Sequence, residues 1–126
     1  MRESVSLLRI ISTPAALDGA AWPRDTAYFR TAPDAAVVLG DEAPALDDPD
    51  AVVFEDTSWE TVVLAPEIGS AVMAAHATWP PPAGGFAQGA VAGIGVKLWV
   101  DSESWLFLVP GAYGFDFAER IAGVVT

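Results

Sequence analysis

The sequence contains no cysteine and few cationic residues. Without cysteine, this chain cannot form disulfide frameworks, zinc ribbons, iron–sulfur sites or a thiol nucleophile. Only 6 Lys and Arg oppose 17 Asp and Glu, so the 126 residues carry a formal net charge of −11. No cation occurs between Thr31 and Val96. Because nucleic-acid binding requires cations that displace phosphate counterions, we expect no nucleic-acid partner, and an anionic membrane surface is disfavoured for the same reason.

Long unbroken apolar runs are also missing. Glu3 and Arg9 interrupt the N-terminal stretch, and the most apolar window, residues 86–100, contains glycines and Lys97. A secretory signal needs an apolar run of ~7–15 residues, and a membrane span needs ~20. The sequence therefore predicts neither, and we expect a cytoplasmic protein.

The remaining composition is typical of a compact domain. Hydrophobic residues make up 52% and charged residues 18%, which argues against disorder. A chain of ~100–150 residues can bury a core without disulfides or metals. We expect one domain over residues 1–126, with a packing tail at 1–26 and a core over 27–122.

Local patterns predict an α+β fold with a mostly antiparallel sheet and two helices. Apolar runs at 27–30 and 35–39 flank a Pro-Asp turn and predict a hairpin, because Pro presets a turn angle and Asp can bond the turn backbone. An acidic loop follows at 40–50. Further strands are predicted over 51–55, 59–65, 88–94, 96–100 and 105–109, with a tight turn at 101–104. Helices are predicted over 66–75 and 113–122, the second stopped by Gly123.

The residues with catalytic or ligand-binding chemistry lack partners at useful spacing. His76 is the only histidine and has no second ligand or nucleophile in a recognisable pattern, so we interpret it as a helix C-terminal residue. The acidic stretch 41–56 lacks the glycine and terminal glutamate of a calcium loop. The glycines at 84–95 match no phosphate-binding motif. We predict no catalytic, cofactor-binding or metal-binding residue in this chain.

Aromatic residues are numerous for so small a core, with 5 Trp, 6 Phe and 2 Tyr. The strand predicted at 105–109 is apolar on both faces, and two helices offer little cover for it. Ordinary core packing and a partner interface both remain possible explanations. The predicted partner interface consists of Trp79, Phe86, Gln88, Trp99, Tyr113 and Phe115.

Three blocks in the second half carry a family resemblance. A strand ending in Leu64-Ala65-Pro66 leads into a helix, Ala87-Gln88 opens a later strand, and Leu108-Val109-Pro110 ends the last strand before an aromatic-rich helix. This order resembles the gamma subunit of heterotetrameric sarcosine oxidase, itself similar to the folate-binding fold of aminomethyltransferases. The chain departs from the family at Gly89, where the family has Thr, and at Gly111, where it has Arg. The acidic loop 40–50 also stands in place of a family helix.

The resemblance implies a noncatalytic gamma-like subunit in a bacterial flavin-dependent oxidase of sarcosine or another N-methyl amino acid. It implies that larger partner subunits carry FAD, FMN, NAD and tetrahydrofolate, while this chain binds none of them. A sheet face that lacks its covering helix loses ~25 cal/mol per Å² of exposed apolar area, so we expect a partner chain to cover it. The alternatives are a small folate-dependent methylene-transfer enzyme, with Glu55 or Asp56 as its carboxylate, and a homo-oligomeric scaffold.

Overall fold

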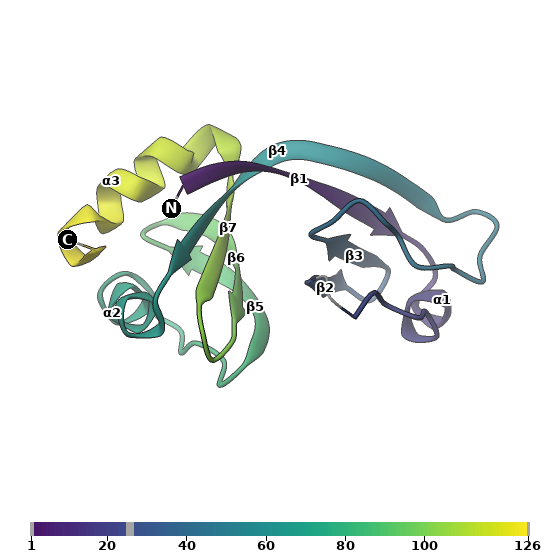
Figure 1. Cartoon of the computed structure of the whole chain (residues 1–126), viewed down its shortest axis with the longest axis horizontal. Coiled ribbons are helices and arrows are strands. Elements are labelled where there is room, and N and C mark those ends of the chain that lie inside the picture. Colours follow the sequence, from purple (N-terminus) through teal and green to yellow (C-terminus); the bar gives the residue numbers. More distant parts are fainter. Residues whose placement is uncertain (1, 25–26, 126) are drawn as a thin grey trace. The chain divides into compact units, whose positions relative to one another are not determined.

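The computed structural model describes residues 2–24 and 27–125 and shows an α+β fold (Figure 1). Its strands are β1 (Arg2–Ile11), β2 (Tyr28–Ala32), β3 (Ala35–Val38), β4 (Val52–Leu64), β5 (Gly85–Val91), β6 (Ile94–Val100) and β7 (Trp105–Pro110). Its helices are α1 (Pro14–Asp18), α2 (Pro66–His76) and α3 (Gly114–Val125), and a 3-10 turn at Gly111–Tyr113 leads into α3. The predicted fold class is thus confirmed, but the predicted number of helices was wrong, because α1 was missed.

The strands follow the hydrogen-bonded order β2-β3-β1-β4-β7-β6-β5, with antiparallel neighbours at β1–β3, β2–β3, β4–β7, β5–β6 and β6–β7. The chain divides into two compact units. The C-terminal unit comprises residues 1–5 and 58–126, and the N-terminal unit comprises residues 6–57. Strands β1 and β4 each contribute residues to both units.

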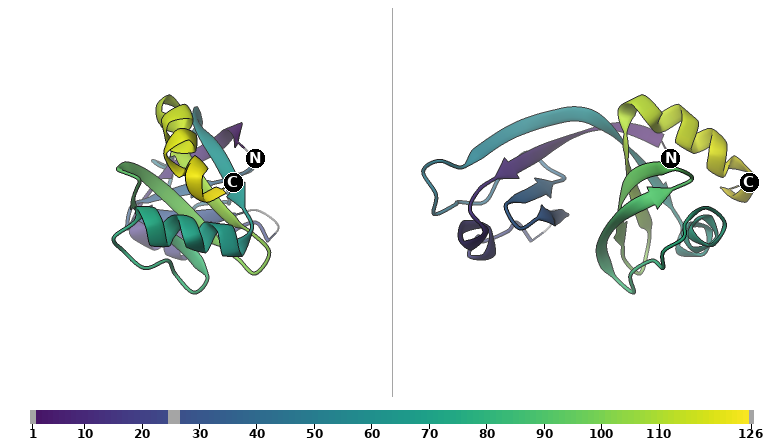
Figure 2. Two further views of the ribbon diagram at one scale, coloured as in Figure 1. Left: turned by 90° about the vertical axis from the view of Figure 1, so that its left-hand side faces the viewer. Right: turned by 180° about the vertical axis from the view of Figure 1, so that it is seen from behind.

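In the C-terminal unit, α2 and α3 cover one face of the sheet formed by β5, β6, β7 and the end of β4 (Figure 2). Strand alternation explains this core, because Val96, Leu98 and Val100 of β6 point to the same face and are buried. Phe117 and Ile121 of α3 lie one helical turn apart and pack into this core between the helix and the sheet. The ring centroids of Phe117 and Phe107 lie 5.9 Å apart.

The β5–β6 hairpin differs from the predicted strands, which ran from residue 88 to 94 and resumed at 96. The turn lies instead at Ala92 and Gly93, whose φ angles are 53° and 78°. A two-residue hairpin turn with two positive φ angles matches the right-handed twist of the strands, and glycine adopts this conformation without strain. Arg120 Nη1 of α3 donates to the carbonyl of Ala92 at 2.6 Å and fixes the turn against the helix.

The predicted turn at 101–104 is confirmed, and Asp101 organises it. Its Oδ1 accepts hydrogen bonds from the backbone N–H groups of Ser104 at 2.8 Å and Glu103 at 2.7 Å. These two bonds, that from Ser104 first, hold the pKa of the Asp101 carboxyl below its usual value. The turn sets the register in which Trp105 lies opposite Val100.

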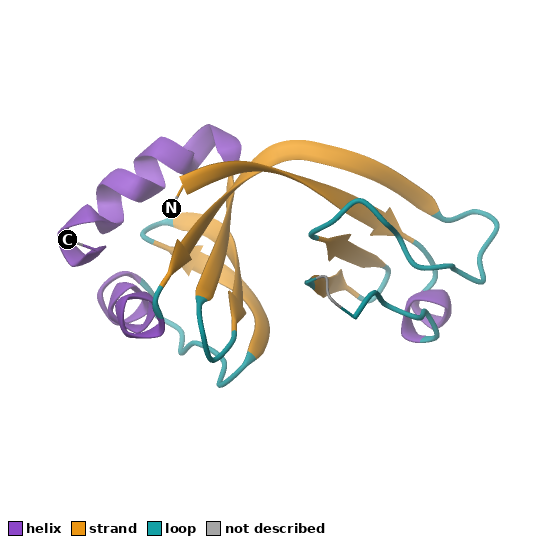
Figure 3. Ribbon diagram, viewed as in Figure 1, coloured by secondary structure: helices purple, strands orange, loops and turns teal. Residues whose placement is uncertain are grey.

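The N-terminal unit contains β2, β3, most of β1, the first half of β4, and α1 (Figure 3). Its core joins Ile10 of β1 and Leu17 of α1 to Ala36 and Val38 of β3. Thr13 caps α1, because its side chain accepts the backbone N–H of Ala16 at 3.2 Å. Residues 1–26, expected to form a packing tail, therefore include a strand and a capped helix.

Other boundaries separate into confirmed and wrong predictions. The hairpin at β2–β3 and the helix beginning at Pro66 are confirmed. Two strands predicted at 51–55 and 59–65 are one strand, β4, because its polar residues Glu55 and Asp56 have partners on β1. The α3 helix continues past Gly123 to Val125. The assignment of residues 1–126 to one domain, with a core over 27–122, stays a prediction.

Replacement of Gly69 by Ala tests the packing of α2 on the sheet. A Cβ atom there would lie 2.8 Å from Cδ2 and 2.9 Å from Cβ of Trp105. The clash involves Trp105 close to its backbone, so it outweighs the gain in helix propensity of at most about 1 kcal/mol. We expect Gly69→Ala to lower the free energy of unfolding by about 1–3 kcal/mol, measured by urea denaturation.

Gly84→Ala is the matched control, because no atom lies within 4 Å of a Cβ atom at that position. Its free energy of unfolding should stay within about 0.5 kcal/mol of the wild-type value. Equal stability of the two variants would contradict the packing of Gly69 against Trp105.

Candidate interaction surfaces

The side chains with catalytic potential lie apart from one another. His76 occupies the last position of α2, and its backbone carbonyl accepts the N–H of Ala92 at 2.8 Å, in agreement with its interpretation as a helix C-terminal residue. Within the described ranges 2–24 and 27–125, no group of three or more His, Asp or Glu side chains is arranged to hold a metal ion. We therefore looked for function on the surface of each unit.

Three of the predicted interface residues lie together on the C-terminal unit. Phe86 of β5 lies opposite Trp99 of β6, and Gln88 lies opposite Lys97 two residues further along. Their neighbour Leu98 points to the opposite face, into the core under α2 and α3. Phe86, Gln88 and Trp99 therefore share the face that these helices leave uncovered.

Polar contacts order this face. Lys97 Nζ donates to Gln88 Oε1 at 3.0 Å, and the same ammonium lies 5.2 Å from the ring centroid of Trp59 on β4. A cation at that distance is attracted by the negative face of the indole ring. The contacts hold a long, flexible lysine side chain across the strands, next to the half-buried rings of Phe86 and Trp99.

Trp79 lies apart from that face. Its ring packs against the helix-covered core and occupies the space beside Gly89, where a Cβ atom would lie 2.7 Å from Nε1. The Nε1–H group donates to the carbonyl of Ala90 at 2.9 Å. The indole is thus packed and hydrogen-bonded within its own unit, and Gly89 leaves room for it.

Tyr113 and Phe115 form a second, strongly exposed aromatic site at the start of α3. Their side chains are 53% and 63% exposed, the two largest values among the exposed large apolar residues described. The Arg2 guanidinium carbon lies 5.9 Å from the ring centroid of Phe115. Rings of this size normally bury 150–250 Å² each, so their exposure next to a cation is typical of an unoccupied contact site.

Two glycines bring this aromatic site onto β4. A Cβ atom at Gly111 would lie 2.9 Å from the Ser58 carbonyl oxygen, and one at Gly114 would overlap the Glu60 carboxylate. Glu60 Oε1 in turn lies 3.1 Å from Arg2 Nε. A carboxylate beside the first turn of a helix interacts favourably with the partial positive charge there. Gly111 therefore has a packing role against β4.

Sequence reasoning missed the exposed residues Val52, Val53 and Phe54 of β4, which are 51%, 44% and 43% exposed. Extended structure was predicted at these residues, but their environment was not. The available signal was the run of three consecutive apolar residues itself. Because successive strand residues point to opposite faces, such a run is buried only when both faces are covered.

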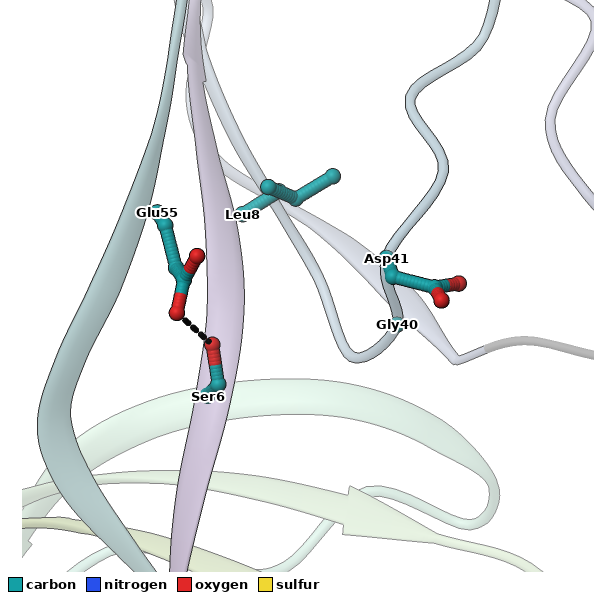
Figure 4. A pocket seen from close by; sticks show the side chains of 5 residues that line it. All are labelled: Ser6, Leu8, Gly40, Asp41 and Glu55. Atoms are coloured by element: carbon teal, nitrogen blue, oxygen red, sulfur yellow. Dashed lines mark hydrogen bonds between the residues drawn. The ribbon is translucent and has the colours of Figure 1, made fainter.

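A cavity of about 430 Å³ lies beside this run in the N-terminal unit, lined by Ser6, Leu8, Gly40, Asp41 and Glu55 (Figure 4). Glu55 Oε1 accepts the hydroxyl hydrogen of Ser6 at 2.9 Å. Asp41 belongs to the loop after β3, toward which the Leu8 side chain extends (Figure 4). The cavity is lined by two carboxylates and a leucine. Such a lining suits a ligand with a cationic group on an apolar stem.

Asp48 gives the acidic loop a defined conformation. Its carboxylate accepts the Ser12 hydroxyl at 2.6 Å, the Asp50 backbone N–H at 2.9 Å and the Thr13 backbone N–H at 3.3 Å. These bonds, that from Ser12 first, hold the pKa of Asp48 below its usual value. The loop is thus hydrogen-bonded to the residues just before α1, although its composition indicated only a solvated charge run.

The similarity of this chain to known proteins lies in its fold. No family model matches the sequence, and no curated protein matches it. Among solved structures, a chain of heterotetrameric sarcosine oxidase from Corynebacterium sp. U-96, in complex with pyrrole 2-carboxylate, matches with a TM-score of 0.75. The match covers 98% of this chain and 81% of that chain.

The chain has the fold of a sarcosine oxidase subunit. The resemblance predicted from its strand-end motifs is confirmed at the level of the fold, and 16% sequence identity agrees with the predicted divergence. The matched sarcosine oxidase chain is the longer of the two.

Replacement of Asp48 by Asn tests the role of its charge. Because the pKa of Asp48 is lower in the folded than in the unfolded chain, its charge stabilises the fold above the unfolded pKa of about 3.9. This stabilisation is lost as the pH falls through the folded pKa. We expect Asp48→Asn to be less stable than the wild type at neutral pH, with a difference that narrows below about pH 4. Urea denaturation across this pH range measures it.

Asp47→Asn is the control, because it removes a neighbouring exposed acid for which the structure shows no such hydrogen-bond set. Its stability difference from the wild type should not narrow in the same way. If the free energy of unfolding of Asp48→Asn differed from the wild-type value by the same amount at every pH, the role of the Asp48 charge would be contradicted.

Proposed function

We propose that this chain is a noncatalytic, gamma-like small subunit of a flavin-dependent oxidase complex that acts on sarcosine or another N-methyl amino acid. The observation that carries the proposal is the fold match over 98% of the chain to a subunit of a heterotetrameric sarcosine oxidase. A likeness that runs along nearly the whole chain favours a role in an assembly of the same kind. The proposed partners are larger flavoprotein subunits.

The exposed aromatic site at α3 supports this role. Tyr113 and Phe115 offer two rings and a nearby Arg2 guanidinium, and residues of these types are enriched in the energetic centres of protein interfaces. The face with Phe86, Gln88 and Trp99 offers further aromatic area. The proposed partner interface therefore keeps these five predicted residues, while Trp79 supports it from within the fold.

In this proposal the partner subunits carry FAD, FMN, NAD and tetrahydrofolate, and this chain carries none. The described cavity does not fit folate, because Asp41 and Glu55 would face the anionic glutamate tail of that cofactor. Both carboxylates considered for folate chemistry have partners within the chain. Glu55 accepts from Ser6, and Asp56 Oδ2 lies 3.6 Å from Arg9 Nη1.

The proposed complex is cytoplasmic. Across the helices of residues 2–24 and 27–125, none combines the length and the apolar character required to cross a membrane. The formal net charge of −11 further disfavours attachment to an anionic lipid surface.

Co-expression of the tagged chain with the genes that flank it in its genome tests the proposal. We expect larger chains with flavin absorbance to co-purify with it. The double variant Tyr113→Ser/Phe115→Ser should reduce the retained flavoprotein by about tenfold or more, because central aromatic residues each contribute more than about 1 kcal/mol to an interface. Absorbance of the eluted flavin measures the retained amount.

The matched controls Tyr113→Phe and Phe115→Tyr retain both rings and should retain the flavoprotein. The free energy of unfolding of the double variant should change by less than about 0.5 kcal/mol, because the replaced side chains are exposed. Purification of a flavin-free monomer from this co-expression would overturn the proposal. Micromolar binding of tetrahydrofolate by the isolated chain would favour the folate enzyme, and a stable homo-oligomer in light scattering would favour the scaffold.

A further inference from the structure

The first half of β4 presents an unusual apolar surface in the N-terminal unit. Val52, Val53 and Phe54 are each at least 43% exposed although they are consecutive. Since Val53 points to one face of the strand and its two neighbours to the other, solvent reaches apolar side chains on both faces. Covering them would remove apolar area from water at about 25 cal/mol per Å².

This part of β4 also has a free edge. Within the N-terminal unit the strand order ends β1-β4, and β7 pairs with β4 only from Trp59 onward. In the described residues, no strand therefore pairs with the second edge of Val52–Glu55 (Figures 1 and 3). Natural proteins protect such edges with charged side chains, Pro or a bulge. Val52–Glu55 contains no Lys and no Pro, and its one charged side chain, Glu55, attracts a cationic strand instead of repelling it.

The negative charge around this edge favours one kind of binding partner over another. Residues 6–57 contain ten Asp and Glu against three Arg, a formal charge of −7. Glu55 and Asp41 line the cavity, and Glu55 shares its strand face with Val53. A second copy of the chain would bring a like charge against this surface, which is unfavourable. A cationic segment would bring the opposite charge.

We propose that the Val52–Glu55 edge binds an extended segment of a partner chain, which adds a strand to β4 and places an arginine or lysine side chain toward the carboxylate of Glu55. Alternate side chains of that segment are apolar and cover Phe54 and Val52 on the opposite face. Backbone hydrogen bonds supply affinity, and the alternation of cationic and apolar residues supplies specificity. The proposal deepens the proposed function, on which it rests for the existence of a partner.

The test uses the full chain and a fluorescein-labelled octapeptide of alternating Arg and Val, with fluorescence anisotropy as the readout. We expect binding that weakens as the salt concentration rises toward about 1 M, where screening reaches within about 3 Å. A Glu-Val octapeptide should bind at least about tenfold more weakly, because its charges are repelled. An Arg-Val octapeptide with alternate backbone N-methyl groups should also bind at least about tenfold more weakly, because it cannot pair as a strand.

Variants of the chain locate the site. Glu55→Gln keeps an acceptor for Ser6 but removes the charge, and Phe54→Ser removes the exposed ring. Each should weaken binding of the Arg-Val peptide by about fivefold to tenfold. The controls are Glu67→Gln, an exposed acid at the start of α2, and Val63→Ser, which lies on the same strand and is 43% exposed, as Phe54 is. Both controls should bind as the wild type does, and thermal melts confirm that each variant is folded.

Four outcomes would overturn the proposal. Equal binding of the N-methylated peptide would exclude strand addition, and equal binding of the Glu-Val peptide would exclude charge selection. A dimer in sedimentation that Phe54→Ser dissociates would assign the edge to a second copy. Flavoprotein that co-purifies without peptide binding would leave the proposed function intact and remove only this site. Peptide binding without co-purified flavoprotein would remove the function and retain the site.

Discussion

The fold depends on the need to cover two faces and two edges of every apolar strand. In the C-terminal unit, α2 and α3 satisfy that need for one sheet face, and α3 does so with only a few side chains, chiefly Phe117 and Ile121. No comparable helix covers the first half of β4 in the described residues, because α1 is only 5 residues long and packs on β1 and β3. The exposed apolar surface of the chain follows from this small supply of helices.

Charge distribution separates the surfaces that attract partners of different kinds. Around α3 the exposed rings lie next to Arg2, so a partner meets aromatic area and a guanidinium there. Around the first half of β4 the exposed apolar side chains lie among acids, so a partner meets apolar area and carboxylates. The two proposed surfaces therefore have opposite electrostatic requirements.

Sequence reasoning predicted elements where one local rule decided the outcome. Pro66 and Glu67 marked the start of α2, and Pro33-Asp34 marked the β2–β3 turn, because each acts on its own backbone. It failed where the outcome depends on residues far apart in the chain. The β5–β6 turn at Ala92 requires a positive φ in a residue that rarely adopts it, and α3 supports that turn through Arg120.

The candidate surfaces were predictable in part for the same reason. Tyr113 and Phe115, which the sequence analysis placed in a partner interface, are indeed strongly exposed. The environment of Trp79 could not be predicted from the neighbouring sequence, because it depends on the absence of a side chain at Gly89 of β5. The run Val52–Phe54 indicated that both faces of the strand need cover, but whether other elements supply that cover depends on residues far away in the chain.

The aromatic site at α3 is positioned before any partner binds. Gly111 and Gly114 allow the backbone to lie directly on Ser58 and Glu60, so the start of α3 cannot move away from β4 without losing that packing. Arg2 then contacts both the Glu60 carboxylate and the Phe115 ring, which restricts the ring as well. A partner that docks there orders fewer side chains on binding and loses less conformational entropy. Gly111 and Gly114 thus favour a rigid contact surface at the start of α3.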